Sequence, residues 1–153
     1  MPRLFSVLSV ISVAAASIVD CGSTWPAHFA VDPPATVGAG QNVSMTATFD
    51  VPIGTPLITD GKIQIYGVAS YLFEMEMVYS MCTYLTCPLT AGTYAWSWVE
   101  PFPADISGQI QMTFRLGPEV AGKQKPWLCL RWTAYATGSP SNATNSAIKW
   151  LYS

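Results

Sequence analysis

Hydrophobic and polar residues alternate along three long stretches of the chain. From Asn42 to Asp50 every second residue is hydrophobic, and serine or threonine stands between. The same alternation occurs from Gln109 to Leu116 and from Trp127 to Ala136. A period of two residues is typical of a strand that buries one face. The pattern therefore predicts three half-buried strands.

A fourth strand is predicted from Thr93 to Val99, where aromatic residues alternate with small ones. Its aromatic residues are Tyr94, Trp96 and Trp98. Pro101 and Pro103 end the strand and hold Phe102 in a stiff loop, because each proline fixes its own φ and restricts the residue before it. We expect Phe102 either in the core or at the mouth of a pocket. At a mouth, Phe102→Asp would leave the protein folded and weaken ligand uptake.

Shorter strands are predicted from His28 to Asp32, from Lys62 to Tyr66 with a break at Gly67, and from Tyr71 to Tyr79. On the last of these, the interior residues are Phe73, Met75 and Met77, and the outer residues are Glu74 and Glu76. We expect the two glutamates to be a solvated face rather than an acid–base pair. About seven short strands with turns between them, and no convincing helix, predict an all-β protein folded as a two-sheet sandwich.

The composition favours one domain with a large core and few charges. Half of the 153 residues are hydrophobic, 10% are charged, and the net charge is -2. The basic residues form no cluster beyond Lys123 and Lys125, so nucleic acid is not an expected partner.

Both ends of the chain are expected to lie outside the domain, which we place at residues 17–136. Arg3 precedes an apolar stretch from Leu4 to Ala15 with small residues at its end, so residues 1–16 are predicted to be a signal peptide. The alternative is an uncleaved membrane anchor, for which the stretch is short. Residues 137–153 combine a polar linker with a short apolar tail. We consider three alternatives for this tail: an extra edge strand, a segment that touches a membrane, or a disordered segment. Glycosylation motifs begin at Asn42 and Asn142.

The cysteines indicate disulfides rather than a metal site. There are four cysteines and a single histidine, His28, and the spacing fits no zinc ribbon or finger. A secreted chain with an even number of cysteines is expected to pair them. No Gly-x-Ser-x-Gly motif and no phosphate-binding glycine loop occurs in the sequence. We therefore expect no enzymatic activity, no metal and no cofactor.

The order of motifs around the aromatic strand resembles the ML (lipid-recognition) domain family, which includes the Niemann–Pick type C sterol carrier and the ganglioside activator. The matching residues are Cys82, Cys87-Pro88-Leu89, Gly92-Thr93-Tyr94 and Pro101-Phe102-Pro103. The resemblance implies an immunoglobulin-like sandwich whose sheets splay to admit lipid. It also implies the disulfides Cys21–Cys129 and Cys82–Cys87. The sterol carrier has a third, early disulfide that this chain lacks.

The resemblance also implies a lipid-binding site. Phe73 and the loop from Phe102 to Ile106 correspond to the entrance of the family's pocket. The wall would consist of Met75, Met77, Trp96 and Trp98. Each of these residues has ordinary core packing as its alternative, and we expect no buried charge among the inward strand faces.

The expected function is that of a secreted or endolysosomal carrier of a sterol, phospholipid or glycolipid, with transient membrane contact. One alternative is a recognition protein that presents lipid to a receptor or an enzyme. Another is a sandwich with a closed core and an adhesive or structural role.

Overall fold

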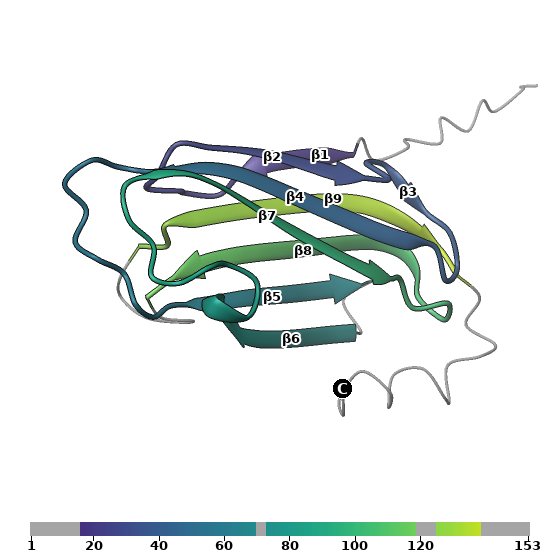
Figure 1. The fold of residues 1–153 in the computed structure, drawn as a ribbon. Helices are drawn as coiled ribbons and strands as arrows, with labels where there is room; N and C mark the ends of the chain where they lie inside the picture. Colours follow the sequence, from purple (N-terminus) through teal and green to yellow (C-terminus); the bar gives the residue numbers. More distant parts are fainter. Residues whose placement is uncertain (1–15, 70–72, 119–124, 139–153) are drawn as a thin grey trace, which may run out of the picture.

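A computed structural model describes residues 16–69, 73–118 and 125–138 (Figure 1). Several predictions lie outside these residues and stay predictions: the signal peptide, the motif at Asn142, the position of Lys123 and the apolar tail. The strands run from Ser17 to Thr137. None of the described residues forms a helix long and apolar enough to span a membrane.

The described chain is almost entirely β-strand. Its elements are β1 (Ser17–Asp20), β2 (Ala27–Asp32), β3 (Thr36–Val37), β4 (Asn42–Val51), β5 (Lys62–Ala69), β6 (Phe73–Ser80), the 3-10 turn η1 (Met81–Thr83), β7 (Gly92–Pro101), β8 (Ser107–Gly117) and β9 (Leu128–Thr137).

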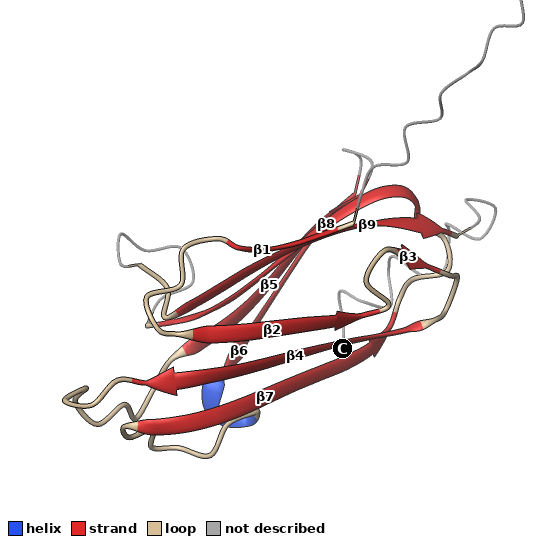
Figure 2. Ribbon diagram, turned by 90° about the horizontal axis from the view of Figure 1, so that it is seen from above, coloured by secondary structure: helices blue, strands red, loops and turns tan. Residues whose placement is uncertain are grey.

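The strands form two sheets that face each other as layers (Figure 2). The larger sheet has the order β1-β9-β8-β5-β6, and β3 pairs in parallel with β9. The smaller sheet has the order β2-β4-β7. All neighbours within these two orders are antiparallel. The predicted all-β fold, an immunoglobulin-like two-sheet sandwich, is confirmed.

The predicted alternation decides which side chains fill the space between the layers. The buried residues of β4 are Val43, Met45, Ala47, Phe49 and Val51, and those of β8 include Ile110, Met112, Phe114 and Leu116. On β9 the buried residues include Leu128, Leu130 and Trp132. Each set lies on one face of its strand, because successive side chains of a strand point to opposite faces.

The predicted break at Gly67 is wrong. Strand β5 continues to Ala69, and Gly67 pairs with Met75 on one side and Met112 on the other. A residue with two pairing partners keeps its backbone hydrogen bonds, so the missing side chain does not end the strand. Two short strands, β1 and β3, were not predicted. The first is adjacent to the expected signal cleavage site, and the second has only two residues.

The disulfides have the pairing that the resemblance implies, Cys21–Cys129 and Cys82–Cys87. The first links the end of β1 to β9, where the Cys21 N–H also donates to the Cys129 carbonyl oxygen at 2.9 Å. Cys129 is buried, although the alternation of its strand puts it on the face opposite to Leu128 and Leu130. It is linked to Cys21, and its N–H donates to the Ser23 Oγ at 2.8 Å, so the N-terminal segment lies against it.

Candidate functional site

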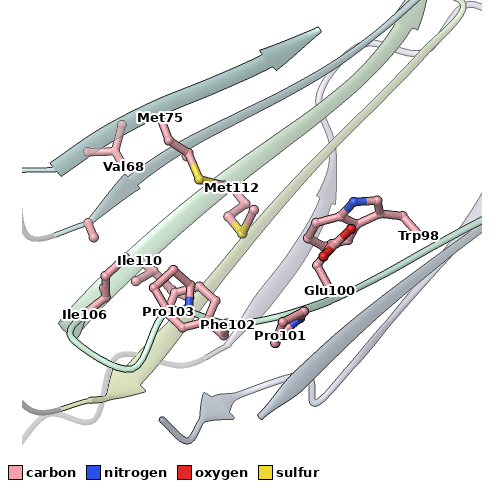
Figure 3. A pocket seen from close by; sticks show the side chains of 12 residues that line it. Val68, Met75, Trp98, Glu100, Pro101, Phe102, Pro103, Ile106, Ile110 and Met112 are labelled. Carbon is pink, nitrogen blue, oxygen red and sulfur yellow. The ribbon is translucent and has the colours of Figure 1, made fainter. Parts of the chain in front are cut away.

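A cleft lies between the two sheets, at the end of the sandwich where β7 runs into the loop before β8 (Figure 3). The space between its walls that no atom occupies is about 400 Å³ when the solvent at the open mouth and the narrow gaps between atoms are included, and only about 20 Å³ admits the centre of a water-sized sphere. The lining residues are Gly67, Val68, Ala69, Met75, Trp98, Glu100, Pro101, Phe102, Pro103, Ile106, Ile110 and Met112. They come from β5, β6, β7, β8 and the loop between β7 and β8, so both sheets contribute to the walls.

Backbone hydrogen bonds hold the loop from Phe102 to Ile106 across the end of the sandwich. The Phe102 N–H donates to the Gln41 carbonyl oxygen at 2.8 Å, and the Gly40 N–H donates to the Phe102 carbonyl oxygen at 3.1 Å. At the other end of the loop, the Gly138 N–H donates to the Ile106 carbonyl oxygen at 2.9 Å. The loop is therefore anchored to the turn before β4 and to the end of β9.

No protein-family model matches the sequence, and no curated protein matches it. The structure is similar to the crystal structure of a Niemann–Pick type C2 protein from the Japanese carpenter ant, with a TM-score of 0.57. The similarity covers 79% of this chain and 99% of the ant protein, at 13% sequence identity. The chain has the Niemann–Pick type C2 fold. This confirms, at the level of fold, the resemblance that the cysteine and proline motifs indicate.

Within the Niemann–Pick type C2 fold, two residues of the loop are both core and cleft residues. Phe102 is 8% exposed and Ile106 is 9% exposed, and both line the cleft. Phe102 therefore lies in the core and lines the cleft at the same time, so the two expected positions do not exclude each other. Because Phe102 is buried, we now expect Phe102→Asp to place a carboxylate in the core and to destabilise the fold.

The expected wall residues differ in where they lie. Met75 and Trp98 line the cleft. Trp96 is buried next to Phe114, with ring centroids 6.4 Å apart, and is not among the lining residues. Met77 is also outside the lining, and its Sδ accepts a hydrogen bond from the Tyr79 hydroxyl at 3.2 Å. Trp96 and Met77 thus have packing roles farther along the strands.

Phe73 begins β6, where its backbone pairs with Ala69, a cleft residue. Its side chain is outside the described part of the structure, so its expected place at the entrance stays a prediction. Asn42, the first residue of β4, is exposed, as glycosylation would require.

Several lining residues were not predicted from the sequence, for different reasons. Ile110 and Met112 belong to an alternating strand and were expected to face inward, but alternation does not tell which inward residues meet a cleft. Glu100 could have been found, because it continues the inward series of Trp96 and Trp98 by one further step of two. Glu100 is a charged residue on an inward face, but it is only half-buried, so the expectation of no buried charge there is not contradicted.

The cleft is apolar except at one position. Among the described residues, Glu100 is the one charged residue in its lining, and no lysine, arginine or histidine lines it. Burial raises the pKa of the Tyr79 hydroxyl on β6, and the charges of Tyr84 and Glu100 raise it further.

The Trp98 side chain brings a second polar atom to the cleft. Its indole Nε1 is buried and has no hydrogen-bond partner in the described part of the chain. The Trp98 ring packs edge-on against Phe114, with centroids 5.6 Å apart.

The outer face of β6 behaves as a solvated surface. The Glu74 carboxylate accepts a hydrogen bond from the Tyr66 hydroxyl at 2.5 Å, which raises the pKa of that hydroxyl. The Glu76 carboxylate accepts from the Gln64 Nε2 at 2.6 Å. Both glutamates are exposed and outside the cleft. His28 is exposed on β2, and within the described ranges no three His, Cys, Asp or Glu residues are grouped to hold a metal ion.

Proposed function

We propose that the protein is a secreted or endolysosomal carrier that binds a sterol or another lipid between its two sheets. The observation that supports this most is the apolar cleft between the sheets, in a fold shared with a Niemann–Pick type C2 protein. Binding would be driven by removal of the apolar ligand from water, with few polar contacts. No metal or cofactor is needed for such a function, and we propose no catalytic role.

The cleft would have to widen to hold a lipid. In this structure the side chains leave little room between the walls. Two of the lining residues are Met75 and Met112, and methionine side chains adapt readily to irregular partners because they are unbranched and polarizable. The cleft lies between β6 and β7, each of which is the edge strand of its own sheet. Parting these edges would break side-chain contacts and leave every strand pair intact.

The proposed compartment is supported by the covalent chemistry. Disulfides persist in oxidising compartments, and both pairs are formed in this structure. The predicted signal peptide and the exposed Asn42 agree with passage through the secretory route. We therefore propose an extracellular or endolysosomal location, where the carrier would collect and release lipid by transient membrane contact.

The alternative of a protein that presents anionic lipids to a receptor or an enzyme has less support. A basic rim would favour it, and the described lining of the cleft contains no cation. A closed structural sandwich is separated from both by the experiment that follows.

The test is lipid extraction from the purified secreted protein, followed by uptake of a fluorescent sterol from vesicles. We expect co-purified lipid and measurable sterol or phospholipid uptake. Gly67→Leu places a side chain in the cleft and should abolish uptake, whereas Thr48→Leu introduces the same side chain on the exposed face of β4 and should preserve it. A folded protein with neither bound lipid nor uptake would contradict the proposal.

A further inference from the structure

Glu100 is the one charged residue among the described residues that line the cleft, and the surface of the cleft is otherwise apolar. Glu100 and Trp98 are two residues apart on β7, so both side chains project from the same face of the strand toward the opposite sheet (Figure 3). Glu100 is only half-buried, and it lines the cleft. Since no described lining residue is a cation, nothing within the cleft compensates this negative charge.

The wall of the cleft also includes a residue with an unpartnered hydrogen-bond donor, the indole N–H of Trp98. Trp98 is 6% exposed, and its Nε1 has no partner among the described residues. A buried donor without a partner is uncommon, because the unmade hydrogen bond costs free energy. Nε1 has almost no accessible surface in this structure, so a polar ligand atom would supply the missing acceptor once the cleft widens.

The two groups together favour one kind of polar end on a ligand. A hydroxyl group both donates and accepts hydrogen bonds, so it can serve a carboxylate and an indole N–H. An ionised carboxylate only accepts, and it would stand beside Glu100 with the same charge. We propose that the cleft selects lipids that end in an uncharged hydroxyl over lipids that end in a carboxylate, and that Glu100 determines this preference. The inference rests on the proposed lipid-binding function.

The expected size of the preference follows from Coulomb's law. Two like charges a few ångströms apart near a protein surface repel strongly enough to change a dissociation constant by about tenfold or more. Partial exposure of Glu100 lets water and salt reduce the repulsion. We therefore expect a carboxylate-ended lipid to bind at least about tenfold more weakly than its alcohol at low salt.

The test uses oleyl alcohol, oleylamine and oleate, which share one hydrocarbon chain and differ at the polar end. Each competes with the fluorescent probe phenylnaphthylamine for the full secreted protein near neutral pH. Oleyl alcohol and oleylamine should both displace the probe at least about tenfold more effectively than oleate. This comparison needs no variant, so it does not depend on how a substitution affects folding.

Variants then identify the residue responsible. Glu100→Gln keeps the shape and removes the charge, so the ratio between oleyl alcohol and oleate should fall to within about threefold, mainly through tighter oleate binding. Glu76→Gln removes an exposed carboxylate outside the cleft and should leave the ratio unchanged. Trp98→Phe keeps a ring and removes the N–H, and should weaken oleyl alcohol by about two- to tenfold.

The outcomes separate the two proposals. If none of the three ligands displaces the probe and the protein takes up no lipid, the carrier function is contradicted and the preference with it. If oleate binds the wild-type protein as tightly as oleyl alcohol, or if Glu100→Gln leaves the ratio unchanged, the carrier function stands and selection by Glu100 is refuted.

Discussion

Adding one methyl group at Gly67 tests whether the space between the sheets is open. Gly67 lies within β5 and lines the cleft. A Cβ atom there would be 3.4 Å from the Cγ and 3.5 Å from the Cε of Met75, and 3.7 Å from the Cγ of Met112. These are ordinary van der Waals distances, so Gly67→Ala needs no displacement of the backbone.

The expected effect on stability is favourable. Replacing a strand glycine by alanine stabilises by about 0.5 to 1 kcal/mol, because the unfolded chain has less freedom to lose. A buried methyl group adds up to about 0.8 kcal/mol, and the tight contact with Met75 offsets part of this. We expect the free energy of unfolding to rise by about 1 kcal/mol, or the melting temperature by about 4 °C. If ligand occupies the cleft, its affinity should fall at the same time.

Gly61→Ala is the matched control, because Gly61 precedes the same strand in a filled part of the core. A Cβ there would be 2.8 Å from the Met81 Sδ and 2.8 Å from the Trp127 Cζ3. Overpacking of this kind costs about 1 to 3 kcal/mol. Urea unfolding of both variants, followed by circular dichroism, gives the comparison. Suppose instead that Gly67→Ala lowered the free energy of unfolding by about 1 kcal/mol or more, as overpacking does. The space beside Met75 would then be filled, and the cleft would not exist as described.

Three further predictions concern the frame around the cleft. Replacing Cys21 and Cys129 by serine removes a link across 108 positions and should cost about 4 to 5 kcal/mol in urea unfolding; an unchanged midpoint would contradict this. Trp132→Phe removes the hydrogen bond from Nε1 to the Pro34 carbonyl oxygen, 2.8 Å away, and should cost about 1 to 3 kcal/mol; a loss below about 0.5 kcal/mol would show that water replaces the bond. Burial raises the pKa of Asp20, but hydrogen bonds from the following backbone N–H groups lower it more, so the folded-state pKa lies below the unfolded one. The ionised Asp20 carboxylate therefore stabilises the fold at pH values above the unfolded-state pKa, and this contribution is lost as the pH falls through the folded-state pKa. The difference in free energy of unfolding between wild type and Asp20→Asn should disappear as the pH falls between these two pKa values.

Strand positions and faces were predictable because they depend on local pattern. The alternation in β4 and β8 reports directly which residues are buried, and the aromatic series on β7 does the same. The prediction at Gly67 was wrong because the low strand propensity of glycine is a local property. The pairing with β6 and β8 that keeps Gly67 in a strand involves residues distant in the sequence. The two-residue strand β3 has too few positions to show any period.

The site was predictable in kind but not in extent. Met75 and Met77 have the same residue type on the same face of β6, yet only Met75 lines the cleft. The difference depends on how far each lies from the end where the sheets are apart, and a period of two carries no information about that distance. Glu100 is the opposite case, because the alternation along β7 was sufficient to place it on the inward face. The predicted inward series ended at Trp98, one step of two residues before Glu100.

The separate pairing of the two sheets has a consequence for amide hydrogen exchange. No strand pair in the described ranges joins β6 to β7, although the cleft lies between them. The N–H groups that β5, β8 and β9 donate across the larger sheet keep their acceptors whether the walls are together or apart. Widening of the cleft and local unfolding of the strands are therefore distinct events with separate free energies. Protection factors in these strands should respond to the overall stability of the fold, and a ligand should be able to exchange many times before any of these amides does.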